Sequence, residues 1–297
     1  MPLPRAKSEC QVLKIPKYPL DCDVPSPLLR RAGPLTNYVL YVVLKALQDA
    51  QLSKDNLDNT KFIFNSPQDP SRKVERYIQK LVTFGEVGAS PIMFSTSIHN
   101  ASTSFISQTF NLIGPSSTIS NMELSLASSI ELATLWLEGS IVDRVIVVSG
   151  DEICHYDAYD FHQRKISTDQ ETYDPLSLDH AICGEAVIGM VLEKPHSQNN
   201  IGKAMLRSRT GLTMEDVLQS SGIIDAKGGY RLEQENDLYE GCTLNHIGKF
   251  IGSTPSVCCA DLTLALEKME QGNLETLNLF QVTNENIAAK ISVQACP

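Results

Sequence analysis

One run of β-branched residues, RVIVVS at 144–149, constrains the fold of this chain more than any other segment. An apolar run without polar alternation is typical of a strand that is buried on both faces of its sheet. EAVIGMVLE at 185–193 has the same character, and KFIFN at 61–65 indicates a shorter strand. Such strands need helices on both sides of the sheet, so the sequence predicts an α/β fold.

Helical periodicity fills the segments between these strands. In 123–138, Leu126, Ile130, Ala133 and Leu137 share one face, and Gly139 marks the end. The other predicted helices of the first half are 36–51, 73–84 and 98–110, with a short extended segment at 117–120. The second half is less clearly patterned: we expect strands near 203–209, 276–281 and 286–294, helices near 213–220 and 259–271, and a poorly patterned stretch at 221–247.

Composition excludes several classes of function. A chain of 297 residues with 42% hydrophobic composition can bury a sizeable core. Its net charge of −10 argues against binding to nucleic acid or to an anionic membrane as the main role. The cysteines show no CxxC pair or metal-ligand spacing, and no phosphate-binding glycine motif occurs, so neither a metal nor another cofactor is expected. Without an apolar signal-peptide core or membrane-spanning stretch, we expect a cytoplasmic protein.

Several segments, taken in order, resemble the β-ketoacyl synthase family. Residues 30–53 are similar to its first long helix, and 90–120 to the segment that leads to its nucleophile. DRVIVVSGDE at 143–152 resembles the strand that ends in the Gly-x-Glu turn of the family, and CGEAVIGMVLEKP at 183–195 resembles its GEG…LE strand. GSTPSVCCADLTLALEKMEQGN resembles the helix after its second catalytic loop. The resemblance implies a thiolase-like architecture with layers α-β-α-β-α, truncated in the second half.

The resemblance further implies one ketosynthase-like domain over residues 1–297. Its N-terminal half would span residues 1–200 and its shortened C-terminal half residues 201–297. Docking of an acidic acyl carrier protein would need a local basic patch. Arg30-Arg31 and the segment SRKVER, with Arg72, Lys73 and Arg76, offer small basic clusters. Each is more simply interpreted as a solvated helix face.

The family carries out Claisen condensation with a cysteine at a helix N-terminus, and this chain has no cysteine there. Counting from Gly114-Pro115, the cysteine position falls on Glu123. A carboxylate is a poor acyl acceptor, whereas a glutamate at the start of a helix is favoured electrostatically. Under either interpretation no thioester forms at this position.

The two histidines that assist the family's cysteine are also missing. No His-Gly-Thr motif occurs, and no histidine lies between His196 and His246. The text GKFIGST places Ser253 at the second histidine position and Gly248 at the lysine position of the family, with Lys249 one place off.

The closing loop, FQVTNEN at 280–286, differs from the family's Phe-Gly-Phe-Gly-Gly-x-Asn pattern. Phe280 and Asn286 remain, but Val282 takes the place of the gating phenylalanine, and Gln281 takes the place of a glycine. Loss of flexible glycines indicates that no gate needs to open for substrate.

Other candidate nucleophiles are weaker. Cys154-His155 are sequence neighbours, which rarely point at each other, and Cys258-Cys259 are interpreted as small packed residues at a helix start. Ser149 lacks the Gly-x-Ser-x-Gly elbow.

The resemblance therefore points to a non-catalytic subunit like the chain-length factor of type II polyketide systems, with a narrower likeness to the partner subunit of aryl-polyene or other highly reducing systems. It would pair with an active ketosynthase as a heterodimer or heterotetramer and meet acyl carrier protein through the complex. Side chains that would line the partner's tunnel are Ile98, Asn100, Phe105 and Thr109, although ordinary core or interface packing explains any single one of them as well.

Two alternatives stay open. A malonyl-carrier decarboxylase that primes synthesis could use Glu123 in place of the cysteine, but the decarboxylases of the family keep both histidines. An active synthase with an unrecognised nucleophile, Cys154 or Cys258, is the other.

Overall fold

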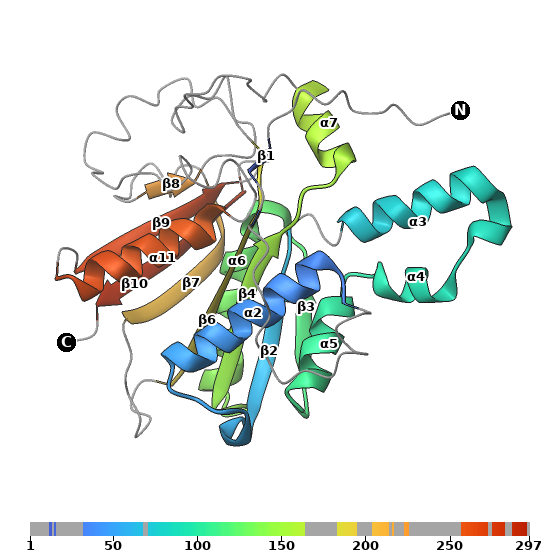
Figure 1. Cartoon of the computed structure of the whole chain (residues 1–297). Helices are drawn as coiled ribbons and strands as arrows, with labels where there is room; N and C mark the ends of the chain where they lie inside the picture. The colour runs from blue at the N-terminus through green and yellow to red at the C-terminus, as the bar shows by residue number, and fades with distance from the viewer. Residues whose placement is uncertain are drawn as a thin grey trace.

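A computed structural model describes most of the elements expected from the sequence. The described residues are 12–13, 15, 32–67, 71–163, 183–194, 204–213, 216, 223–225, 257–272, 275–282 and 287–295. They form two four-stranded sheets and one two-stranded sheet, with helices between and beside them (Figure 1). This arrangement confirms the predicted α/β class.

The first sheet contains the buried strands that the sequence predicts. Its strand order is β3-β2-β4-β6, in which β3, β2 and β4 run parallel and β6 runs antiparallel to β4. Every residue of β2 is buried, and so is every residue of β4 after Arg144. The strands are β2 (Thr60–Asn65), β3 (Ser116–Ile119), β4 (Arg144–Asp151) and β6 (Ala186–Glu193).

The second sheet comes from the C-terminal part of the chain. Its order is β7-β10-β9-β8, and β10 runs antiparallel to both β7 and β9. Its strands are β7 (Ala204–Thr213), β8 (Ile223–Asp225), β9 (Thr276–Val282) and β10 (Ile287–Ala295). A small parallel pair joins β1 (Val12–Leu13) to β5 (Cys183–Gly184).

Helices cover the first sheet on both faces. α2 (Pro34–Asp49) and α5 (Ala101–Thr109) lie on its outer face, where Leu40, Val43 and Ile106 pack with Phe62 and Phe64 of β2. α6 (Ser125–Glu138) lies on the inner face, where Ala133 and Leu137 pack against Ile63 and Val147. The alternation of side chains along β2 and β4 therefore fills two separate cores.

α6 and α11 (Val257–Glu270) lie between the two sheets. Leu126 and Ile130 of α6, and Leu262 and Ala265 of α11, form one core with Leu279, Ile291 and other residues of β9 and β10. The described residues thus build four successive layers of the thiolase-like architecture: helix, sheet, helix, sheet. None of the described helices is long and apolar enough to cross a membrane.

Sequence periodicity located the long elements within a few residues. The predicted helices at 36–51, 73–84 and 259–271 correspond to α2, α3 (Ser71–Phe84) and α11. The helix predicted at 98–110 is shorter, because residues 97–100 form a bend and turn before α5. The helix predicted at 213–220 and the stretch 221–247 fall almost wholly outside the described residues.

Two short helices were not predicted, α4 (Pro91–Thr96) and α7 (His155–Gln163). Both are too short to show a helical period. The end of α6 also differs in detail: Gly139 has an ordinary φ of −68°, and the left-handed residue is Ser140, with φ 55°.

A helical hairpin extends away from the sheets (Figure 1). It consists of α3, η2 (Gly85–Gly88) and α4, and we call it the apolar hairpin. Glu75 is the only buried residue of α3. The large apolar side chains that the hairpin exposes are Ile78, Val82, Phe84, Val87, Ile92 and Phe94.

The middle layer supplies a test of the fold. Ile130 is fully buried between the sheets, so Ile130→Ala should lower the free energy of unfolding by about 2–5 kcal/mol. Leu135→Ala on the same helix is the matched control, because Leu135 is 60% exposed. It should change stability by less than about 0.5 kcal/mol. Urea unfolding followed by circular dichroism measures both, and equal losses would contradict the buried position of Ile130.

Candidate functional site

The turn between β3 and α6 holds Glu123, the residue that counting along the sequence assigns to the cysteine position. η3 (Met122–Leu124) forms a single 3-10 turn directly before α6, so Glu123 lies at a helix start as expected. Met122 has φ 45°, a left-handed conformation that is uncommon and costly for a residue with a side chain. A strained turn therefore precedes a half-exposed carboxylate.

Ser125 closes this turn with its hydroxyl. Ser125 Oγ donates to the Met122 carbonyl at 2.7 Å and accepts from the Asn121 backbone N–H at 2.9 Å. The Asn121 side chain donates to Ser128 Oγ at 3.1 Å. These contacts fix the backbone around position 123 without using the Glu123 side chain. The carboxylate at the start of this helix is a poor acyl acceptor.

Gln281, which the sequence places at a glycine position of the gate loop, is hydrogen-bonded to α6. Its side chain is 2% exposed, and Oε1 accepts a hydrogen bond from the Ala127 backbone N–H at 3.0 Å. This bond satisfies one of the free N–H groups in the first turn of the helix. Phe280 is 1% exposed in the same strand, with Lys290 Nζ 5.8 Å from its ring centroid. The described part of this segment is an ordered strand end held to the middle layer.

The four predicted tunnel residues do not share one environment. Ile98 is 39% exposed and Asn100 is exposed at the start of α5, whereas Phe105 is half-buried and packs against the core of α2 and β2. Thr109 Oγ1 donates to the Phe105 carbonyl at 2.8 Å, within the helix. Ile98 and Asn100 remain candidates for contact with a partner. Phe105 and Thr109 make local contacts within the chain, and a role for them in lining a partner's tunnel stays a prediction.

Several predicted positions lie outside the described residues. These are Ser253, Gly248, Lys249, His246, Asn286 and the pair Arg30-Arg31. Val282 ends β9, and Cys258 and Cys259 lie in the first turn of α11.

Cys154 and His155 do not form a nucleophile–base pair. Cys154 is buried. Burial, and to a smaller extent the negative charge of the nearby Asp157 carboxylate, raises the pKa of its thiol from 9.0 to about 12. The His155 ring instead faces Glu75, with Nδ1 3.2 Å from Oε1. A thiol with so high a pKa carries almost no thiolate at neutral pH. Ser149, another rejected candidate, is buried and hydrogen-bonds to Asn65.

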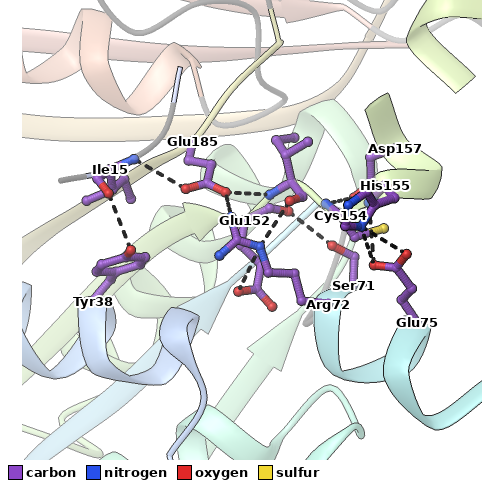
Figure 2. Close-up of polar contacts among 11 residues, drawn as sticks. Ile15, Tyr38, Ser71, Arg72, Glu75, Glu152, Cys154, His155, Asp157 and Glu185 are labelled. Carbon is purple, nitrogen blue, oxygen red and sulfur yellow. Dashed lines mark hydrogen bonds and ion pairs between the residues drawn. The ribbon is translucent and has the colours of Figure 1, made fainter. Parts of the chain in front are cut away.

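A buried ionic cluster lies where β4 ends and β6 begins (Figure 2). The antiparallel register pairs Asp151 with Ala186, and its continuation by one residue brings Glu152 opposite Glu185. Both residues are buried, at 1% and 4% exposure. Like charges that face each other across strands destabilise a sheet. A cation is therefore needed at this edge.

Arg72 of α3 supplies that cation. Its guanidinium forms an ion pair with Glu185, and its Nε lies 3.9 Å from Glu152 Oε2. The same Nε donates to the Ile153 carbonyl at 3.0 Å. We call Arg72, Glu152 and Glu185 the ionic cluster. SRKVER is therefore not simply a solvated face: Arg72 is mostly buried and Lys73 partly so, while Arg76 is exposed.

Burial dominates the electrostatics of the cluster. It raises the pKa of Glu152 from 4.5 to about 7, against the opposing effect of Arg72. Neither carboxylate oxygen of Glu152 has a hydrogen-bond partner of normal geometry in the described part of the chain. Burial likewise lowers the pKa of Lys73, which Glu152 partly opposes. A pKa near neutrality suits acid–base catalysis, but ion-pair networks that hold a structure together produce the same shift.

Contacts around the cluster favour a structural role. Glu185 accepts hydrogen bonds from the Ile15 and Ile153 backbone N–H groups, both at 3.2 Å. Tyr38 of α2 donates to the Ile15 carbonyl at 3.4 Å. The cluster thus joins α3 to the ends of β4 and β6, and Ile15 links it to α2. Among the described residues no group of three or more His, Cys, Asp and Glu side chains could hold a metal ion.

Comparisons with known proteins bear on the whole chain. A family model described as β-ketoacyl synthase, N-terminal domain, matches residues 7–200. No curated protein matches the sequence.

Solved structures match nearly the full length of the chain. A β-ketoacyl synthase from Burkholderia phymatum STM815 has a TM-score of 0.76 at 13% identity, covering 96% of this chain and 88% of its own. The type II polyketide synthase acyl-carrier protein and ketosynthase complex AntDE:AntF gives 0.74 at 12%, covering 97% and 91%. The ishigamide ketosynthase/chain length factor gives 0.71 at 12%, covering 99% and 89%. These likenesses show that the chain has the thiolase-like ketosynthase fold.

The raised pKa of Glu152 makes stability depend on pH. Between pH 4.5 and about 7 the folded protein keeps a proton on Glu152 that the unfolded chain releases, so stability falls as pH rises through this range. Glu152→Gln removes this dependence. The variant should be more stable than the wild type by up to roughly 3 kcal/mol at pH 8 and about equal to it at pH 4.5.

Urea unfolding at both pH values measures this difference. Glu138→Gln is the control, because Glu138 is exposed on α6. A difference between Glu152→Gln and wild type that is the same at both pH values would contradict a buried, titrating Glu152.

Proposed function

The chain belongs to the β-ketoacyl synthase family, and from that premise we propose that it is a non-catalytic, chain-length-factor-like subunit that pairs with an active ketosynthase. One observation carries the proposal: counting from Gly114-Pro115 assigns the cysteine position of the family to Glu123. Glu123 lies in a turn closed by Ser125, before a helix in which the Ala127 N–H donates to Gln281. A carboxylate there repels the negative charge that an acyl-transfer intermediate develops. The Gln281 contact takes a backbone donor of the helix N-terminus, where such charge is normally stabilised.

Pairing is supported by exposed apolar surface in the N-terminal half. Val87 is 94% exposed and Ile92 70%, both in the apolar hairpin. Ile113 and Met122, which flank β3, are 77% and 61% exposed. Among the described strands β3 lies at an edge of the first sheet, and an open edge presents unpaired backbone groups to another chain. An apolar surface around an open strand edge fits a large protein partner.

The proposed partner determines the remaining roles. Ile98 and Asn100 lie at the N-terminal end of α5, after α4, and would contact the partner there and help to close its acyl tunnel. Acyl carrier protein would meet this chain through the complex. The chain spans one ketosynthase-like domain with a shortened second half, and it would act in the cytoplasm without a cofactor of its own.

Acyl transfer to this chain should not occur. After incubation with a labelled acyl-carrier protein, intact-mass and peptide mass spectrometry should find no acyl adduct, because position 123 offers a carboxylate and Cys154 has a raised pKa of about 12. An adduct on Cys154 or Cys258 would overturn the non-catalytic assignment. Robust decarboxylation of malonyl-carrier protein by the purified chain, abolished by Glu123→Ala, would instead favour a priming decarboxylase.

Pairing should depend on the apolar hairpin. Co-expression with the ketosynthase encoded beside this chain, followed by size-exclusion chromatography, should give one complex. Val87→Asp and Ile92→Asp should each weaken it about tenfold or more, because both bring a charge into an apolar interface. Ile141→Asp is the control, since Ile141 is 55% exposed at the other end of the first sheet, before β4. Equal complex formation by the hairpin variants and the control would place the interface elsewhere.

A further inference from the structure

The apolar hairpin has an unusual attachment to the rest of the protein. α3 carries apolar residues with helical spacing, Ile78 and Val82 among them, yet these are 41% and 55% exposed. Its only buried residue is the charged Glu75. An amphipathic helix in a globular protein normally docks through its apolar face. Here Val74, Tyr77 and Leu81 are half-buried but no apolar residue of the helix is fully buried, so other interactions must help to hold the helix in place.

Polar contacts hold α3, and they are concentrated in its first two turns (Figure 2). Ser71 Oγ donates to the Glu152 carbonyl at 3.1 Å. Glu75 accepts from the His155 backbone N–H at 3.4 Å and faces the His155 ring. Arg72 makes the ion pair with Glu185 and the hydrogen bond to Ile153. All these partners belong to the segment after β4 or to the start of β6.

Arg72 differs from the other two residues in what its loss would leave behind. The Glu185 and Glu152 side chains are 0% and 1% exposed, so without Arg72 two facing carboxylates would remain buried. A buried charge that loses its partner destabilises its surroundings far more than a surface charge does. By contrast, the His155 side chain is 81% exposed, so its pairing with Glu75 is screened by water.

The length of α3 beyond Arg72 increases the displacement that a change at Arg72 causes at the far end of the hairpin. Arg72 lies at the start of a helix that continues to Phe84, and η2 and α4 follow from its far end. Contact between Tyr77 and Phe94, whose ring centroids are 5.8 Å apart, ties α4 back to α3. The hairpin therefore moves as a unit when its first turn changes direction.

We propose that Arg72 is a positioning residue that orients the apolar hairpin for pairing, through its bridge to Glu152 and Glu185. This inference rests on the proposed pairing function, but its structural part concerns the free chain. Arg72 does not contact the partner itself. It sets the direction in which the exposed apolar side chains are presented.

Hydrogen exchange of the free protein tests the structural part. Arg72→Met keeps the length and apolar stem of the side chain but removes its charge and its donors, and Glu185→Gln removes the opposite charge. Both should raise amide exchange in residues 73–96 about tenfold or more, with β2 and β4 unchanged. Arg76→Met is the matched control, since Arg76 is exposed one turn further along the same helix. It should leave exchange at the wild-type level.

Charge reversal separates positioning from general destabilisation. Arg72→Glu combined with Glu185→Arg restores opposite charges between α3 and the strand ends, but an arginine at 185 cannot accept the Ile15 and Ile153 hydrogen bonds. The double variant should therefore recover slow exchange in the hairpin in part, and neither single change should. If Arg72→Met does not fold, Arg72→Lys replaces it: the charge stays but the forked contacts are lost, and an intermediate exchange rate is expected.

Pairing with the co-expressed ketosynthase tests the functional part. Arg72→Met should weaken the complex about tenfold or more, Arg76→Met should not, and the reversed pair should recover it in part. If the wild type forms no complex, the proposed function fails, while the exchange measurements still decide whether Arg72 holds the hairpin. Pairing by the wild type together with unchanged exchange and unchanged pairing in Arg72→Met would overturn the role of Arg72 alone.

Discussion

Burial of α6 between two sheets is the constraint on which the rest of this structure depends. One side of the helix packs on the first sheet through Ala133 and Leu137, and another packs on the second sheet and α11 through Leu126 and Ile130. The second sheet also holds the helix by polar contacts, since Ser208 Oγ donates to the Ala127 carbonyl at 2.8 Å and Gln281 accepts from its N–H. Packing therefore fixes the start of the helix, and with it position 123, without any contribution from the side chain at 123.

That independence means that the turn around position 123 can form whether or not its side chain is catalytic. Met122 keeps a left-handed conformation before Glu123, and Ser125 satisfies the neighbouring backbone groups. The turn is thus maintained by backbone and hydroxyl contacts, so the identity of the side chain at 123 is free to change. The Gln281 amide stabilises the helix start at a position where a glycine would leave the N–H of Ala127 open.

The sequence alone predicts the elements in which apolar residues recur at a regular spacing. β4, β6, α2 and α6 follow from β-branched runs and helical spacing, because burial on both sides leaves a clear pattern. α4 and α7 were missed because each is too short for a period. The position of Glu123 followed from counting along a resemblance. The ionic cluster did not, although Glu152 and Glu185 both belong to motifs that the sequence displays, because their meeting depends on the antiparallel register of β4 and β6. The burial of Arg72 depends in turn on where α3 lies.

An amphipathic helix has one apolar stripe, and what that stripe contacts determines which interactions attach the helix to the rest of the protein. Where the stripe packs on the body, attachment is broad and tolerates small rotations, since the hydrophobic effect has no direction. In α3 much of the stripe is exposed and none of it is fully buried, so ion pairs and hydrogen bonds at the first two turns contribute to the attachment. Those interactions contribute little net stability once desolvation is counted, as the raised pKa of Glu152 shows, but they are directional. A buried charge cluster is then best understood as the element that gives an exposed apolar surface a defined orientation, at a cost in stability that the packed layers around α6 can absorb.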